Sequence, residues 1–305
     1  MPFRTVSALN EVARTCFPGL TPGALRLRGR LILAGLRNPD RTAPFLNPAP
    51  GSALERVLQG RPELPGILVW PYQSAHWEAA ARLDRMAAHY AETDRIGAPL
   101  IFEADEKLVV TDLGAYHPGL RLVVDQPRWF MREGGLVLNM FVDDFRAFSL
   151  AFSLGRSADG RLQAVIGGLQ GRNAEDALAL YRDLTKALAG LRPRDFLIEA
   201  FRMLCRSWEV QEILAVTQAA RHHQHPYFGE KDLTPDYDAI WEDRGGTPLD
   251  ASFYSLPVDP GTRDLATVKP KKRSLYRRRF AFLDMLEDRL AGDLAAATPT
   301  RFTDT

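Results

Sequence analysis

The sharpest change in hydrophobic period along the chain lies between residues 162 and 189. A mainly apolar run over 162–169 is typical of a strand covered on both faces, and Gln170, Gly171, Arg172 and Asn173 then supply a turn. Apolar residues recur at helical spacing over 177–188, and Asn173 is a suitable N-cap for that helix. A junction of this kind either presents backbone N–H groups to a phosphate or is only a structural link.

The segments around this junction predict the rest of the sheet. Strand patterns precede it at 108–110, 121–124, 136–142 and 147–154, and their short links favour an antiparallel meander. A helix over 195–207 and a strand over 210–217 follow, and we expect that strand to return parallel to 162–169. The predicted fold class is α+β, with a mixed, mainly antiparallel sheet flanked by helices.

The outer parts of the chain have different patterns. Residues 1–65 are rich in Arg, Pro and Gly, which predicts an irregular N-terminal arm. A single domain is expected over 66–291, beginning with a helix over 73–90 in which His89 is partly buried, and 292–305 is expected to be a frayed tail. Further patterns predict a helix over 236–242, a strand over 253–256 and a helix after a basic run at 269–279.

Composition narrows the class of protein. The 305 residues are 46% hydrophobic and 25% charged with a net charge of +1, as in an ordinary soluble protein. Cys16 and Cys205 have neither metal-ligand spacing nor a disulfide framework, which fits a reducing compartment. There is no signal-peptide pattern, and no apolar run approaches the ~20 residues that span a bilayer. We therefore expect a cytoplasmic protein.

Four short segments stand out as motifs. They are FSLAF (148–152) followed by IGGLQG (166–171), AVT (215–217) followed by His222, DYDAIWE (236–242) before Gly245 and Gly246, and KRSLYRRRF (272–280). Together they resemble the VirK/YbjX family of Gram-negative bacteria, over about residues 65–290. The resemblance implies links to virulence, to resistance against antimicrobial peptides and to expression of surface proteins. It implies no biochemical activity residue by residue.

The order of predicted elements favours a GNAT-like acyltransferase architecture. In that fold a meander leads to a strand, a phosphate-binding turn and a helix, and the next strand separates to admit the pantetheine arm of coenzyme A. Gln170, Gly171, Arg172 and Asn173 would form the pyrophosphate turn, for an acyl-CoA or an acyl carrier protein thioester. His222 is the expected base and Tyr227 the expected acid for attack by an amine or hydroxyl. A single glycine in the turn, followed by Glu175 and Asp176, argues against this.

Two other classes of function stay open. In the first, His222, His223 and His225 bind a metal completed by Asp236, Asp238 or Glu242, although a solvated His-rich loop is commoner and no metal is expected. In the second, the protein is a binding or regulatory module. Seven of the eleven residues over 269–279 are basic, and they would contact phosphates of a nucleic acid, an anionic lipid or coenzyme A. The side chains expected to do so are those of Lys272, Arg273, Arg277, Arg278 and Arg279.

Overall fold

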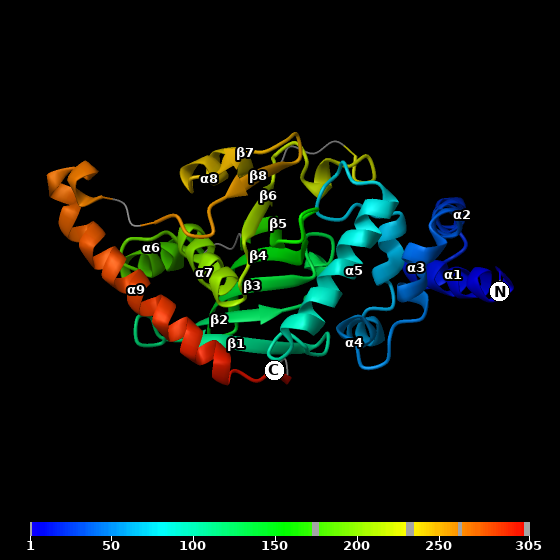
Figure 1. Ribbon diagram of the computed structural model, residues 1–305, viewed down its shortest axis with the longest axis horizontal. Coiled ribbons are helices and arrows are strands. Elements are labelled where there is room, and N and C mark those ends of the chain that lie inside the picture. Colours follow the sequence, from blue (N-terminus) through cyan, green and yellow to red (C-terminus); the bar gives the residue numbers. More distant parts are fainter. Residues whose placement is uncertain (1, 173–176, 230–234, 262–263, 302–305) are drawn as a thin grey trace.

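The protein is built around one open, twisted sheet with helices on both faces. A computed structural model describes residues 2–172, 177–229, 235–261 and 264–301. In these residues nine strands are ordered β7-β8-β6-β5-β4-β3-β2-β1-β9 (Figure 1). Neighbouring strands are antiparallel except for β5 and β6, which are parallel. The fold is therefore α+β with a mixed, mainly antiparallel sheet, as the sequence predicts.

Seven of the nine strands lie where the sequence predicts them, and β7 and β9 were not predicted. Their bounds are β1 Glu106–Asp112, β2 Leu120–Asp125, β3 Leu136–Val142, β4 Phe145–Arg156, β5 Leu162–Gly171, β6 Glu212–Val216, β7 Thr247–Pro248, β8 Phe253–Leu256 and β9 Thr300–Arg301. The meander of β1 to β5 and the parallel return of β6 confirm the predicted connections. They could be predicted because hydrophobic alternation and short turns are local signals.

The described residues also contain nine α-helices. They are α1 Pro2–Cys16, α2 Pro22–Arg37, α3 Pro39–Leu46, α4 Ala53–Gly60, α5 Ala79–Ile96, α6 Ala177–Ala187, α7 Pro193–Ser207, α8 Tyr237–Asp243 and α9 Arg273–Ala296. None of the described helices has both the length and the apolar content that crossing a bilayer requires.

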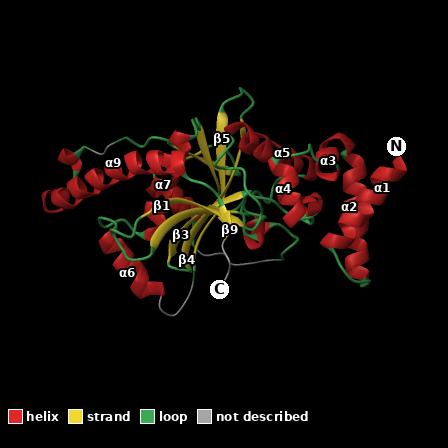
Figure 2. Cartoon of the chain, turned by 90° about the horizontal axis from the view of Figure 1, so that it is seen from below, coloured by secondary structure: helices red, strands yellow, loops and turns green. Residues whose placement is uncertain are grey.

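The two faces of the sheet differ in polarity. Phe152 of β4 points to α7, where its ring centroid lies 4.8 Å from that of Phe201. The next residue, Ser153, points the other way, accepts a hydrogen bond from Arg85 of α5 at 3.0 Å and donates one to Gln73 at 2.7 Å. Figures 1 and 2 both show α7 and α9 on one side of the strands and α5 with α1–α4 on the other. The apolar core therefore lies under α7, whereas polar contacts cross the face under α5.

Residues 2–60 form four helices, so the prediction of an irregular arm was wrong. Prolines at the first turn, as in Pro22 and Pro39, start helices because the N–H they lack has no partner within the helix there. Thr21 and Ser52 then accept hydrogen bonds from the first turns of α2 and α4. Leu31 of α2 is fully buried in a second hydrophobic core shared with the start of α5. The domain boundary drawn at residue 65 stays a prediction.

Three further expectations need correction. The helix expected over 73–90 spans Ala79–Ile96, because the backbone N–H of Gln73 donates to Arg132 and its side chain donates to Val165. His89 is fully buried on α5, and its Nδ1 accepts a hydrogen bond from the Leu154 N–H at 3.1 Å. At the other end of the chain α9 continues to Ala296 and β9 pairs with β1, where a frayed tail was expected.

Candidate functional site

The parallel pair β5 and β6 separates before either strand ends. The two strands pair over four positions, from Gln163 opposite Glu212 to Ile166 opposite Ala215. Beyond that point β5 continues to Gly171, still paired with β4, while Val216, the last residue of β6, pairs only with β8. The β5–β6 pairing therefore stops short of the Gln170 end of β5, and this unpaired edge is called the opening below.

Side chains of α8 occupy the opening. The Tyr237 hydroxyl accepts a hydrogen bond from the Leu169 N–H at 2.7 Å and donates one to the Leu169 carbonyl at 2.9 Å. On the other strand, the Trp241 indole N–H donates to the Val216 carbonyl at 2.8 Å. These backbone groups are the ones that a longer β5–β6 ladder would have paired, so aromatic side chains replace strand pairing here.

A buried carboxylate lies against β5 next to this opening. Glu133 is 6% exposed, and the Gln170 side-chain amide donates to both of its carboxylate oxygens at 3.3 Å. A Cβ added to Gly168 would overlap this carboxylate, and one added to Gly167 would overlap the Glu133 backbone carbonyl. The two glycines of the IGGLQG motif therefore make room for Glu133 beside the strand.

Burial makes Glu133 a weak acid. It raises the pKa of the Glu133 carboxyl to about 8, although the nearby Arg221 guanidinium and the hydrogen bond from Gln170 act in the opposite direction. Arg221 itself is buried, with its guanidinium 3.9 Å from the centre of the Tyr237 ring. Glu133 is therefore protonated at neutral pH, and a protonated carboxyl can donate a proton.

Two histidines complete the cluster. His222 and His223 start the 3₁₀ turn His222–Gln224, their ring centroids lie 3.7 Å apart, and His222 is buried. One nitrogen from each ring and one carboxylate oxygen of Glu133 all lie within 4.8 Å of one another. This Glu133 cluster, meaning Glu133, His222 and His223, thus offers either an acid and a base near each other or three ligands for a cation.

The Glu133 cluster faces a cavity of about 350 Å³. Trp70 and Phe228 supply its aromatic walls, and the Arg132 guanidinium lies 4.8 Å from the Trp70 ring and 5.2 Å from the Phe228 ring. A cavity of this size holds a small ligand or one arm of a larger one. The cluster therefore has space in front of it for a reacting group.

The other predicted catalytic and metal-binding residues do not join the cluster. Tyr227 packs beside Phe228 under Arg132 and does not line the cavity. His225 lines a different cavity, and its Nδ1 accepts a hydrogen bond from the Tyr227 N–H. Asp236 caps α8 by accepting from the N–H groups of Asp238 and Ala239. The metal set built on His225 and Asp236 is therefore not assembled, because His225 faces a different cavity from His222 and His223 and Asp236 caps a helix.

The predicted pyrophosphate turn was placed too early, because Gln170 and Gly171 are the last two residues of β5 and pair with β4. Gln170 contacts Glu133, and Gly171 ends β5 opposite Phe148. Arg172 donates its N–H to the Ala147 carbonyl, and its guanidinium lies 5.6 Å from the centre of the Phe145 ring. Asn173 lies outside the described residues.

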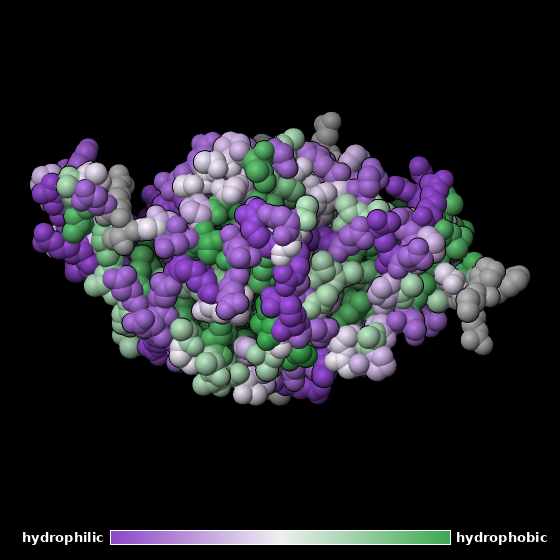
Figure 3. Space-filling view, in the orientation of Figure 1, coloured by the Kyte–Doolittle hydropathy of each residue, from purple (hydrophilic) through white to green (hydrophobic). Residues whose placement is uncertain are grey.

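The basic run lies away from the Glu133 cluster. Figure 1 shows the start of α9 at the end of the molecule opposite α1, and Figure 3 shows a largely hydrophilic surface there. Arg277 and Arg278 are exposed with Lys272, whereas Arg273 and Arg279 donate to backbone carbonyls. None of the five lines the cavity beside Glu133, so the structure does not bring the basic run to the turn at Gln170.

Sequence reasoning missed Glu133 as a site residue. The Glu-Gly-Gly segment at 133–135 has the pattern of a turn, and nothing local separates a buried carboxylate from the usual solvated one. The position of Glu133 depends on its contact with Gly168 and its proximity to His222, and both residues are 35 or more positions away in the chain. The sequence feature that could have indicated a buried group here is the pair of adjacent glycines, Gly167 and Gly168, within an apolar strand.

Comparison with known proteins is consistent with the sequence motifs. The model of a family described as proteins of unknown function, DUF535, matches residues 23–292, so it reaches into α2, beyond the expected limit near residue 65. The uncharacterized protein YbjX of Escherichia coli is 26% identical over 311 residues, which cover 95% of this chain and 91% of YbjX. An uncharacterized protein of Haemophilus influenzae is 31% identical over 154 residues, half of each chain. The chain thus belongs to the DUF535 family of VirK/YbjX-like proteins.

Proposed function

We propose that the protein is an acyltransferase that moves an acyl group from a thioester to an amine or hydroxyl. The observation that carries the proposal is the separation of β5 and β6 after four residue pairs, at the end where the Glu133 cluster lies. A meander followed by a separating parallel strand is the arrangement that admits the pantetheine arm of coenzyme A in GNAT-like enzymes. The arm would take the place of the Tyr237 hydroxyl on the Leu169 backbone.

The Glu133 cluster supplies the proton transfers that this reaction needs. His222 removes a proton from the attacking amine or hydroxyl, whose lone pair forms the new bond to the thioester carbonyl carbon. The carbon–sulfur bond then breaks, and the departing thiolate takes a proton from Glu133, whose raised pKa keeps it protonated. Glu133 thus replaces Tyr227 as the proposed acid, because Tyr227 does not line the cavity.

Calorimetry with coenzyme A and acetyl-CoA tests the proposal. We expect saturable binding of both, weakened about tenfold by Arg172→Ala because the turn loses a cation beside the pyrophosphate. Arg182→Ala, an exposed arginine on α6, is the matched control and should leave the affinity within about twofold. Failure of either compound to bind at millimolar concentration would remove the basis for acyl transfer.

A metal centre is the second candidate, favoured by the mutual approach of Glu133, His222 and His223 within 4.8 Å. Two imidazoles and one carboxylate suit zinc or non-haem iron, and they leave positions open toward the cavity. Gln170 would then hold the second carboxylate oxygen and fix the orientation of Glu133. In this case His222 is a ligand and cannot serve as the base.

Metal analysis of untagged protein separates the two candidates. A metal centre predicts stoichiometric zinc or iron, and binding of Co²⁺ with visible absorption bands that His222→Ala and Glu133→Gln abolish. His117→Ala, in an exposed loop, is the control and should leave the bands unchanged. Metal-free protein that also gives no Co²⁺ bands would eliminate this candidate.

A further inference from the structure

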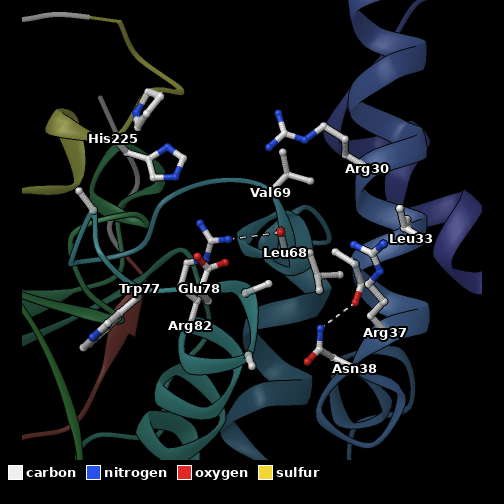
Figure 4. Close-up of a pocket in the computed structure, with 15 residues that line it drawn as sticks. Arg30, Leu33, Arg37, Asn38, Leu68, Val69, Trp77, Glu78, Arg82 and His225 are labelled. Atoms are coloured by element: carbon white, nitrogen blue, oxygen red, sulfur yellow. Dashed lines mark hydrogen bonds between the residues drawn. The ribbon is translucent and has the colours of Figure 1, made fainter.

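A second, larger cavity lies between α2 and the start of α5. Its volume is about 780 Å³, and it is lined by Arg30 and Arg37 of α2, by Arg82 of α5, by His225 and by apolar side chains that include Val69 and Trp77. Figure 4 shows Arg30 reaching from α2 across the opening toward His225, with Arg82 between the two walls. The cavity differs from the one at the Glu133 cluster and shares no lining residue with it.

The charges around this cavity are unbalanced. Three guanidinium groups face one carboxylate, that of Glu78. Arg30 and Arg37 are exposed, and neither side chain makes a hydrogen bond or an ion pair with any residue that the structure describes. By contrast, the cavity beside α9 brings Arg202, Arg206, Arg244 and Arg279 together with five carboxylates. The cavity between α2 and α5 therefore carries an excess of positive charge that the cavity beside α9 does not.

Arg82 is a buried cation that donates to no carboxylate among the described residues, although Glu78 lies close enough to favour its charged form. It is 5% exposed, and its guanidinium donates only to the Trp70 carbonyl at 2.8 Å and the Leu68 carbonyl at 3.4 Å. Its Nε is buried with no hydrogen-bond partner in the described part of the chain. Arg202, which is 2% exposed, instead pairs with Glu199 at 3.0 Å. Buried charges are normally paired at close range, so the buried guanidinium of Arg82, with its unpartnered Nε, is suited to bind an anion.

His225 adds a neutral donor on the opposite wall. Its Nδ1 accepts a hydrogen bond from the Tyr227 N–H at 3.0 Å, so the neutral ring carries its proton on Nε2. Burial together with the charges of Arg82 and Arg30 lowers the pKa of His225, which keeps the ring neutral. The cavity thus offers two free guanidinium groups, a buried third one and an imidazole N–H.

We infer that this cavity binds a phosphomonoester attached to an apolar or aromatic body. Arginine forks match the oxygens of a phosphate, and several arginines around one cavity favour a dianion over a single carboxylate. Val69, Trp77, Leu33 and Pro226 give the rest of the ligand an apolar wall. A volume of about 780 Å³ is in the range that small organic ligands occupy. This inference goes beyond the proposed acyl transfer and does not depend on it.

Calorimetry with phenyl phosphate, inorganic phosphate and vesicles containing phosphatidic acid tests the inference. We expect phenyl phosphate to bind about tenfold more tightly than inorganic phosphate, because the ring is removed from water. Arg30→Ala and Arg37→Ala should each weaken binding about tenfold by removing a charge-assisted hydrogen bond. Both residues are exposed, so neither substitution should disturb folding.

Arg26→Ala provides the control, because Arg26 is an exposed arginine on the same helix that does not line the cavity. It should change the affinity by less than about twofold. Binding to the vesicles alone, lost in Arg30→Ala and Arg37→Ala, would keep the inference and identify a lipid phosphate as the source. Equal binding of phenyl phosphate and inorganic phosphate, equal effects of all three substitutions, or no binding of any probe would each overturn it.

Discussion

Replacing Tyr237 by Phe is expected to lower the free energy of unfolding by about 2–4 kcal/mol, although it removes only one oxygen atom. That oxygen pairs with both the N–H and the carbonyl of Leu169, and both groups are buried where β6 no longer reaches β5. A buried backbone group that loses its partner costs about 1–3 kcal/mol. Urea unfolding of the two proteins measures the difference.

Tyr276→Phe on α9 is the matched control, since the Tyr276 hydroxyl makes no hydrogen bond with the described residues. Its effect should stay within about 0.5 kcal/mol. A loss below about 1 kcal/mol for Tyr237→Phe would show that other groups satisfy Leu169. The same variant also tests acyl transfer. In wild type the Tyr237 hydroxyl competes with coenzyme A for the Leu169 backbone. Tyr237→Phe removes this competitor, so the affinity of the protein for coenzyme A should rise.

The stability of the protein is expected to fall as the pH rises from about 5 to 8, and Glu133→Gln should remove most of that slope. The folded protein holds the Glu133 proton up to a pKa of about 8, against 4.5 for an ordinary glutamate. Between these values the folded state binds more protons than the unfolded chain, so raising the pH favours unfolding. The contribution is on the order of a few kcal/mol across the window.

Urea unfolding at a series of pH values, in the presence of a chelator, measures this effect. Glu11→Gln on the exposed side of α1 is the control and should keep the wild-type slope. Parallel stability curves for wild type and Glu133→Gln would contradict the raised pKa. Because the glutamine is neutral at every pH, its advantage over wild type should be largest near pH 8.

The elements that the sequence predicted correctly are those with local signals. Alternation in Phe148, Leu150 and Phe152 predicts β4, and Phe152 of this strand packs against α7. Residues 2–60 were misread because their prolines were taken as breaks, whereas Pro22 and Pro39 stand at the first turn of helices. A proline can end one helix or start the next, and only its position relative to the helix distinguishes the two cases.

The candidate site was predictable only in part, for a related reason. The separation of β5 and β6 follows from strand order, and His222 follows the end of β6, so both could be anticipated. Glu133 comes from a loop between β2 and β3, and its partners Gly168 and His222 lie far along the chain. The burial of Arg82 could not be predicted either, because it depends on the packing of α2 against the segment before α5. Contacts between residues far apart in the chain produce no hydrophobic periodicity that a single sequence would show.

The way α8 closes the opening in the sheet has a consequence for hydrogen exchange. The Leu169 amide is protected by a tyrosine hydroxyl, whereas amides over 163–166 are protected by a neighbouring strand. Its exchange with solvent deuterium therefore reports the undocking of one short helix, on the free-energy scale of a local opening and not of global unfolding. A single amide thus becomes a readout of whether α8 is docked against the unpaired edge of β5.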